Sequence, residues 1–411
     1  MWNKNFILLW QGLFVSQIGT QLFSLALLYW VLETTGSATI MGLVLMAAAL
    51  PGALLGPFAG TLSDNVSRKF LIIWSDVARG LVGIIFVLVL WHGKEEWALP
   101  VLFLSQIVFG VCSAIFTPAA NASVPDLIPK KHLPAANSIL QGTNSLTRTA
   151  CFALGGYLYT ALGPSWLFLI NGLSYLISAF AECFISIRQI FPAERMTRQN
   201  VLIKFRVETL EGLRYVWANK GLRIVVAMLG LINFVLVPTS IAMPMLVRDF
   251  LQRGPEFLGL MGACQAAGSL AGFVFAGSVK ISPERRPLFV LSCMIATGFL
   301  ILTLSSTTNP IFILLNLSAF GFLIPLINVN IISVMQGTTP SEIRGRVMGV
   351  MGTVLLGLIP FSQGLSGLLI DAVNQQVPLI YTAVGGLFIG LVLLVSCAAS
   401  FRSYLATDYA K

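Results

Sequence analysis

Residues 98–119 read ALPVLFLSQIVFGVCSAIFTPA, a run that contains no charged side chain. An α-helix of about 20 apolar residues is long enough to cross the hydrocarbon core of a bilayer. A strand of a membrane barrel instead alternates apolar and polar residues over about ten positions. This run therefore predicts a membrane-spanning helix.

The composition of the whole chain agrees with that prediction. Of its 411 residues, 56% are hydrophobic and only 10% are charged, and the mean hydropathy is +0.86. Soluble proteins carry about 25% charged residues, and disordered chains have low hydrophobicity, so both classes are excluded. We predict an all-α integral membrane protein. Windows of about 20 residues place twelve spans near residues 6–31, 40–62, 70–91, 98–119, 136–161, 166–187, 222–246, 256–279, 287–306, 310–335, 344–369 and 378–400.

The positive charges predict how these spans are oriented. Of the 25 lysines and arginines, 20 fall in loops on the side of the two termini, three fall on the other side, and Arg79 and Arg148 lie within spans. By the positive-inside rule, both termini are expected in the cytoplasm. The net charge of +9 then reflects membrane insertion, so we expect no nucleic-acid partner. The first apolar run is too long for a removable signal peptide.

The longest polar stretch predicts a division of the chain into two halves. We expect an N-terminal six-helix bundle over residues 1–187, a cytoplasmic linker over 188–221 and a C-terminal six-helix bundle over 222–411. A weak internal repeat supports this division, because Pro118 and Pro129 have counterparts at Pro325 and Pro340, about half the chain away. In the linker, apolar residues at helical spacing predict an amphipathic helix on the cytoplasmic membrane surface. These residues are Ile203, Val207, Leu210, Leu213 and Trp217.

The turn after the second predicted span, residues 60–69, reads GTLSDNVSRK. Gly60 would let a neighbouring helix approach closely, and Asp64 would face either a helix N-terminus or the guanidinium of Arg68. Such a group would hold helix ends together as a gate. The turn resembles the signature loop of the major facilitator superfamily. The corresponding turn of the second half, residues 277–286, keeps the glycine and the basic pair but has no aspartate.

Further motifs resemble one branch of this superfamily, which includes macrolide efflux proteins and the enterobactin exporter. They are TPA at 117–119, PDLIP at 125–129, NSLTR at 144–148, EGLRY at 211–215 and RGRV at 344–347. The resemblance covers nearly the whole chain. It implies two pseudo-repeated six-helix halves around a central cavity, proton antiport, and a place in a bacterial inner membrane.

One position departs from the pattern of that branch. Cys151 and Phe152 stand where members usually carry a Gly-Pro pair associated with antiporters. The departure concerns the driving force and leaves the expected fold unchanged.

Ionisable side chains within the predicted spans are candidate functional residues, because an uncompensated charge is costly inside a bilayer. Asp76 and Arg79 stand one helical turn apart near the Arg68 end of the third span. This spacing indicates an ion pair that supports the gate, and proton coupling by Asp76 is the alternative. Glu182, near the end of the sixth span, suits proton exchange, or else it reaches outward to Arg188.

Polar residues in the spans predict a substrate cavity. Arg148 lies near the middle of the fifth span, and Asn144 and Gln141 share its helical face. They would bind an anionic or acceptor-rich substrate, or else form a buried hydrogen-bond network. The other uncharged polar residues would line a cavity for an amphipathic solute, or join helices by hydrogen bonds. The predicted substrate-binding or coupling residues are Arg148, Asn144, Gln141, Gln17, Gln21, Glu182, Asn233, Gln265, Asn328 and Gln363. The predicted cytoplasmic gate consists of Gly60, Asp64, Arg68, Lys69, Asp76, Arg79, Asp126, Arg344 and Arg346.

Small residues within the spans are expected to serve packing. Gly52, Gly56 and Gly60 recur at every fourth position of the second span, which favours close helix contact. The six cysteines lie in apolar runs without a Cys-x-x-Cys spacing, and we interpret them as small core residues. They are Cys112, Cys151, Cys183, Cys264, Cys293 and Cys397.

Absent motifs narrow the function. The Gly93-Lys94 pair lacks the remainder of a phosphate-binding loop, so we expect secondary transport driven by a proton gradient, without a cofactor. Neither His-Glu-x-x-His nor Gly-x-Ser-x-Gly occurs, so we expect no enzyme activity. The sequence predicts a monomeric exporter of an amphipathic drug, such as a macrolide, or of a siderophore. A lysophospholipid flippase and a membrane receptor that does not transport are the alternatives.

Overall fold

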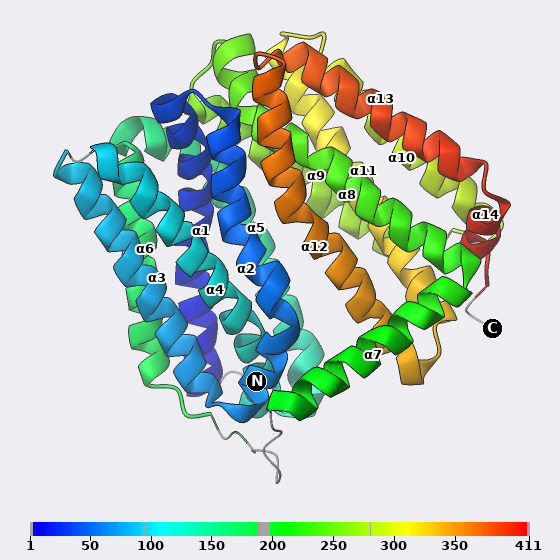
Figure 1. Cartoon of the computed structure of the whole chain (residues 1–411), viewed down its shortest axis with the longest axis horizontal. Helices are drawn as coiled ribbons and strands as arrows, with labels where there is room; N and C mark the ends of the chain where they lie inside the picture. The colour runs from blue at the N-terminus through cyan, green and yellow to red at the C-terminus, as the bar shows by residue number, and fades with distance from the viewer. Residues whose placement is uncertain (1–2, 94, 188, 190–197, 280, 409–411) are drawn as a thin grey trace. The chain divides into compact units, whose positions relative to one another are not determined.

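The computed structural model describes residues 3–93, 95–187, 189, 198–279 and 281–408, and these residues form helices without a strand (Figure 1). The helices are α1 (Lys4–Thr35), α2 (Ala38–Asn65), α3 (Arg68–Trp91), α4 (Glu95–Leu127), α5 (Leu133–Leu162), α6 (Pro164–Cys183), α7 (Arg198–Ala218), α8 (Lys220–Met245), α9 (Pro255–Ser278), α10 (Arg286–Thr303), α11 (Pro310–Thr338), α12 (Ser341–Ala372), α13 (Val377–Ser396) and α14 (Ala399–Leu405), with the short segments η1 (Lys130–His132) and η2 (Leu246–Phe250).

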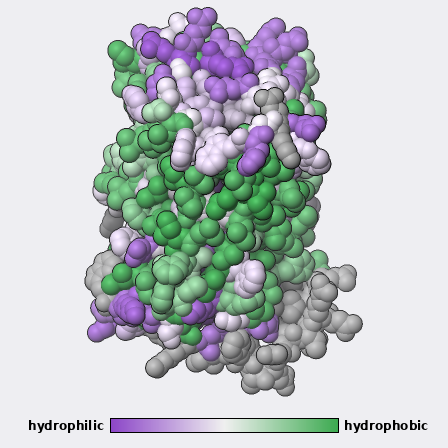
Figure 2. All heavy atoms as spheres, turned by 90° about the vertical axis from the view of Figure 1, so that its left-hand side faces the viewer, coloured by the Kyte–Doolittle hydropathy of each residue, from purple (hydrophilic) through white to green (hydrophobic). Residues whose placement is uncertain are grey.

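Eleven of the described helices are long and apolar enough to cross a membrane. The helix α5 is not among them, because Gln141, Asn144 and Arg148 reduce its apolar content. Together with α5, the eleven account for the twelve predicted spans. On the face that Figure 2 shows, hydrophobic side chains form a broad band between two hydrophilic ends. Such a band is what the hydrocarbon core of a bilayer requires.

The ends of the helices differ from the predicted ends. Asparagine side chains cap several starts: Asn3 accepts a hydrogen bond from the Phe6 backbone N–H (2.8 Å), and Asn219 and Asn309 act in the same way. The predicted span 166–187 is too long, because α6 ends at Cys183. Beyond this end, the Ser186 backbone N–H donates to the Asn5 side chain (3.1 Å) instead of continuing the helix.

Contacts divide the chain into two compact units. The first comprises residues 1–36, 43–201 and 254–259, and the second comprises residues 37–42, 202–253 and 260–411. In the first unit, α3 packs on α4 and α6, and α1 packs on α5 and α6. In the second unit, α8 packs on α12 and α13, and α10 packs on α11 and α13.

Small residues allow the closest helix contacts in the first unit. A Cβ atom added to Gly83 of α3 would lie 3.3 Å from the Cα atom of Gly172 on α6. A Cβ atom added to Gly12 of α1 would lie 2.9 Å from the Ser178 Oγ atom, and Gly19 contacts α6 as closely. Helices in a membrane associate through packing of this kind, because burial of apolar surface drives no association within lipid.

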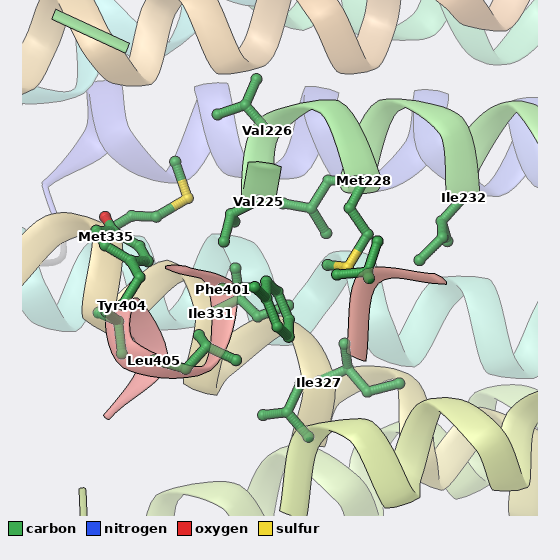
Figure 3. Packing of buried hydrophobic residues seen from close by; sticks show 14 of the residues in the cluster. Val225, Val226, Met228, Ile232, Ile327, Ile331, Met335, Phe401, Tyr404 and Leu405 are labelled. Carbon is green, nitrogen blue, oxygen red and sulfur yellow. The ribbon is translucent and has the colours of Figure 1, made fainter. Parts of the chain in front are cut away.

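The core of the second unit includes aliphatic and aromatic side chains of α8, α11 and α14 (Figure 3), together with residues of α10, α12 and α13. Phe401 and Leu405 of α14 are fully buried there, against Val225 of α8 and Ile331 of α11. The short helix α14 therefore fixes the end of α8 to the end of α11.

The helices α2 and α9 are each divided between the two units. In each, the first turn belongs to one unit and the rest of the helix to the other. Residues 37–42 of α2 lie in the second unit, where Asp371 of α12 accepts hydrogen bonds from the Ser37 hydroxyl (2.7 Å) and the Thr39 backbone N–H (2.8 Å). Residues 254–259 include the start of α9 and lie in the first unit, against α5. Asp371 thus supplies the N-terminal cap of α2.

Two packing predictions are wrong. A Cβ atom added to Gly52, Gly56 or Gly60 would meet no described atom within 4 Å, because this face of α2 is open. Close contact occurs instead at Gly42 and Gly110, where α2 meets other helices. Among the cysteines, those at 183 and 397 are exposed rather than in the core, since each lies at or just beyond the end of a helix.

Candidate functional site

Arg68 organises the ends of three helices in the first unit. Its guanidinium forms ion pairs with Asp126 of α4 (2.6 Å) and Asp64 of α2 (3.1 Å), and it also donates to the Ala122 carbonyl (2.9 Å). Three of the predicted gate residues thus meet at one point. Because each carboxylate comes from a different helix, Arg68 joins α2, α3 and α4.

Gln189 completes this network and was not among the predicted residues. Its side-chain Oε1 atom accepts a hydrogen bond from the Arg68 backbone N–H (2.8 Å), and its side-chain Nε2 atom donates to the Ser63 carbonyl (3.1 Å) and the Val66 carbonyl (3.2 Å). Lys69 donates to the Cys183 carbonyl at the end of α6 (2.6 Å). Gln189 is uncharged and lies in a polar stretch, so the sequence carried no signal for this role.

The second unit has related contacts with different chemistry. Arg286 donates to the Leu405 and Thr407 carbonyls (3.2 Å each). Arg346 of α12 forms an ion pair with Glu211 of α7. Of the other predicted gate residues, Arg344 donates only locally, to the Thr339 carbonyl (3.2 and 3.3 Å).

A cavity of about 650 Å³ with a mixed polar and apolar lining lies beside the Arg286 contact, within the second unit. Its walls come from α9, α11 and the turn that joins α9 to α10. Its polar lining includes Asn330, Ser333, Arg286 and Asp408. The sequence drew attention to the turn at 277–286, but nothing in the sequence indicated that the turn forms a cavity wall.

Asp76 and Arg79 do not belong to the Arg68 network, although we predicted them as part of the same gate. They form an ion pair with each other inside the helix bundle, where Asp76 is fully buried and Arg79 is 5% exposed. The Arg79 guanidinium lies between two aromatic rings, 4.5 Å from the centre of Phe116 on α4 and 4.4 Å from that of Tyr175 on α6. Both rings favour the cation through their negative faces.

Glu182 lies in the same buried cluster. It is the second-to-last residue of α6, yet it is only 1% exposed. Ser178 donates to its Oε1 atom (3.3 Å), while its Oε2 atom has no hydrogen-bond partner among the described residues. It is close enough to Asp76 for the two carboxylates to repel one another. Arg188, the predicted alternative partner, lies outside the described residues.

Arg148 lies midway along α5 and is exposed, as are Asn144 and Gln141 on the same face. Within the part of the chain that the structure describes, Arg148 has no ion pair or hydrogen bond. The three side chains form a polar line along α5. Such a line is incompatible with contact to lipid, so this face of α5 requires water or a polar ligand.

The other predicted polar residues are less uniform. Gln17 and Gln21 of α1 are half-buried, and the Gln17 carbonyl oxygen is buried without a hydrogen bond to any described group. Asn233 of α8 donates to the Leu229 carbonyl (2.9 Å), so its amide serves its own helix. Gln265 of α9 and Gln363 of α12 are half-buried. Asn328 of α11 is exposed.

Comparison of the sequence with known protein families identifies the family of this chain. The sequence profile of the Major Facilitator Superfamily matches residues 9–362. The chain belongs to the major facilitator superfamily. It is thus a multi-pass membrane transporter of small molecules.

Relatives within the superfamily include named efflux proteins. The chain is 25% identical over 376 residues to macrolide efflux protein A of Streptococcus pyogenes, with 91% of each chain covered. It is 27% identical over 374 residues to the multidrug efflux pump Tap of Mycolicibacterium fortuitum, with 88% of each chain covered.

Solved structures of the superfamily share the fold. A bacterial homologue of the iron transporter ferroportin in an inward-facing state superposes with a TM-score of 0.73 at 17% identity, covering 96% of this chain and 98% of that chain. The nucleoside transporter NupG superposes with a TM-score of 0.72 at 12% identity, covering 98% and 99%. At these identities the likeness concerns the fold alone.

Proposed function

We propose that this superfamily member exports an amphipathic small molecule across a bacterial inner membrane in exchange for protons. The efflux relatives match nearly the full length of the chain, which favours the same direction of transport. In this proposal the energy source is the proton gradient.

The observation that carries the proposal is the exposure of Arg148 at the middle of α5. An arginine at that depth is costly unless it faces water or a partner. Asn144 and Gln141 lie beside it on the same face and offer further hydrogen-bond donors. We therefore assign this face of α5 to the substrate path.

The chemistry of this face favours a substrate with several acceptor oxygens and an apolar body. A guanidinium donates to carboxylate, carbonyl and hydroxyl oxygens, and half-buried residues such as Gln17 and Gln21 of α1 add amide groups. Lactone macrolides and oxygen-rich siderophores both meet this description. Both have the apolar surface that a mostly hydrophobic cavity binds.

Transport would proceed by alternating access, with the halves 1–187 and 222–411 rocking about the substrate path. In this proposal the Arg68 network and the Arg346–Glu211 ion pair lie on the cytoplasmic side and control access there. The positive-inside distribution of lysine and arginine supports this orientation.

The proposal is tested in inside-out vesicles with an acidic interior. The pH of the interior is recorded while macrolides, siderophores, lipophilic cations and lysolipids are added one at a time. An exporter that exchanges protons makes the interior more alkaline when its substrate is added. Silence across this panel, with expression verified, would contradict proton-coupled export.

Arg148 is tested in the same vesicles. We expect Arg148→Ala to weaken substrate affinity by about tenfold to a hundredfold, because a hydrogen bond from a charged donor is lost. Arg148→Lys, which keeps the charge, should retain part of the affinity. Arg402→Ala on α14 removes an exposed arginine elsewhere and is the matched control. Unchanged affinity and turnover in Arg148→Ala would remove this face of α5 from the substrate path.

One observation favours a second candidate, movement of lysophospholipids. An apolar groove of about 730 Å³ opens on the surface of α9, α10 and α11, lined by residues such as Gly268, Ala271 and Phe299. Its apolar lining suits an acyl chain. Transfer of a fluorescent lysophospholipid between leaflets, with no change of pH inside the vesicles, would favour this candidate over proton-coupled export.

A further inference from the structure

We infer that Asp76 and Glu182 form a proton-binding site between α3 and α6, and that Tyr175 connects this site to the polar face of α1. The inference rests on the proposed function, because it names the site where the exchanged proton would bind. It also identifies a coupling site that lies on different helices from the proposed substrate residues of α5.

The number of charges in the cluster is the first argument. Two carboxylates, Asp76 and Glu182, share this buried region with one guanidinium, that of Arg79. If all three were ionised, one negative charge would remain without compensation in a region closed to water. An uncompensated buried charge is strongly unfavourable, and two carboxylates in one site relieve it by sharing a proton. The cluster is neutral when it holds one proton.

The unsatisfied oxygen atoms are the second argument. The Asp76 Oδ2 and Glu182 Oε2 atoms are both buried, and neither has a hydrogen-bond partner among the described residues. Ser178 lies beside both carboxylates and donates to Glu182. Buried polar atoms without partners are rare in folded proteins, so this pair identifies the place where a proton or a water molecule is needed.

The surroundings offer little other charge. The helix α4 contributes the Phe116 ring and the Cys112 thiol, and α1 contributes Gly12 and Ser16, which are small and uncharged. From α3, Lys69 binds the backbone carbonyl of the residue after Glu182 rather than the carboxylate. Among the described residues, Arg79 is the cation that forms an ion pair with a carboxylate of this site, that of Asp76.

Tyr175 provides the connection to α1. Its ring lies against the Arg79 guanidinium, and its hydroxyl is 2.9 Å from the Thr20 hydroxyl of α1. Thr20 donates its own proton to the Ser16 carbonyl (2.7 Å), so Tyr175 is the donor in the bond between the two hydroxyls. Thr20 lies next to Gln21, one of the predicted substrate residues.

A mechanism for coupling follows from these contacts. Loss of the proton leaves two carboxylates that compete for Arg79, and a shift of the guanidinium displaces the Tyr175 ring stacked on it. Tyr175 then pulls on Thr20 or releases it, which moves the face of α1 that carries Gln21. A proton bound behind α1 thereby changes the substrate path without contact between proton and substrate.

The test separates transport from coupling by two assays on each variant. Exchange of labelled substrate at equal pH needs alternating access only, whereas accumulation driven by a pH gradient also needs the proton site. We expect Glu182→Gln and Asp76→Asn to retain exchange and to lose gradient-driven accumulation by about tenfold or more. Glu96→Gln, an exposed carboxylate at the start of α4, is the matched control.

A second pair of variants tests the connection to α1. Tyr175→Phe keeps the ring against Arg79 and removes only the hydroxyl, and Thr20→Val removes the acceptor. Both should retain exchange and lose stimulation by the pH gradient. In the wild-type protein, infrared difference spectra between acid and alkaline pH should contain a protonated-carboxyl band that is missing in Glu182→Gln or in Asp76→Asn.

The outcomes distinguish the two proposals. Gradient-driven accumulation at the wild-type rate in both Glu182→Gln and Asp76→Asn would overturn the proton site and leave the exporter proposal intact. Exchange without any effect of the gradient in the wild-type protein would overturn proton antiport itself. Should one of the carboxylate variants fail to fold, the other carboxylate variant and Tyr175→Phe still decide the matter, because each variant is assayed separately.

Discussion

Arg68, Arg79 and Arg148 illustrate how burial determines what an arginine does in this transporter. Arg68 is partly exposed and holds two carboxylates at the helix ends. Arg79 is buried and satisfied by Asp76 and two aromatic rings. Arg148 is exposed midway along a span and has no described partner. The same side chain therefore serves as a clamp, as a buried counter-ion and as a candidate ligand.

Removal of the counter-ion should destabilise the protein. Arg79→Met leaves Asp76 and Glu182 buried without a cation, and breaking a buried pair costs about 3–5 kcal/mol. We expect a clear drop of the thermal unfolding midpoint of the detergent-purified protein at neutral pH. The drop should be smaller at acid pH, where both carboxylates are protonated.

Two controls accompany this measurement. Arg285→Met removes an exposed arginine at the start of α10 and should leave the unfolding midpoint nearly unchanged. The double variant Arg79→Met with Asp76→Asn should recover stability, because it restores the charge balance. Equal midpoints for Arg79→Met and the wild-type protein would show that Arg79 compensates no buried charge.

At the scale of single helices, α7 is packed against the protein on one side and exposes apolar side chains on another. Val216 is buried in the hydrophobic core of the second unit, and Glu211 binds Arg346 of α12. The adjoining side exposes apolar residues, including Leu213 and the 65% exposed Trp217. Arg223 lies over the Trp217 ring at 5.3 Å, as is typical of a side chain at a membrane surface. We propose that this face of α7 rests on the inner leaflet.

Spin labels on α7 test this placement. A label at Leu213→Cys should collide readily with oxygen, which dissolves in lipid, and poorly with a water-soluble nickel complex. A label at Glu208→Cys, which we place on the polar side of α7, should show the reverse. Labels at both positions that are equally accessible to the nickel complex would place α7 in water.

The apolar runs predicted the spanning helices because backbone N–H and C=O groups in lipid must be satisfied within one segment. Helix ends were harder to predict, since capping by Asn219 or the Ser186–Asn5 contact depends on the folded chain. For the candidate site, the motif at 60–69 pointed to Asp64 and Arg68. Nothing in the sequence showed that Asp76 and Glu182 meet, because α3 and α6 are distant in the chain and adjacent only after packing.

At the scale of the whole molecule, the proposed alternating access requires that the halves move, and the contacts at the helix ends must then change. The structure describes such contacts in each unit: Arg68 with Asp126 in the first, and Arg346 with Glu211 in the second. Both are charged and partly exposed. Exposed ion pairs contribute about 0–1 kcal/mol each, so these contacts can break in every cycle.

Cross-linking tests the need for this motion. Cysteines replace Ser67 and Ser341, at the starts of α3 and α12, in a variant without the native cysteines. We expect a cleavable bifunctional maleimide that joins them to stop transport, and cleavage to restore it. Singly substituted variants treated with the same reagent are the controls. Transport at the full rate by the cross-linked protein would exclude motion of these helix ends.

In the proposed antiport, the single excess negative charge in the Asp76–Arg79–Glu182 cluster would also limit how steep a concentration difference the transporter maintains. A site that exchanges one proton for one substrate molecule gains about 1.4 kcal/mol for each pH unit across the membrane, which corresponds to a tenfold concentration ratio for a neutral substrate. The membrane potential adds about 2.3 kcal/mol per 100 mV for the one charge that moves. The charge count of the cluster thus sets a thermodynamic ceiling on export.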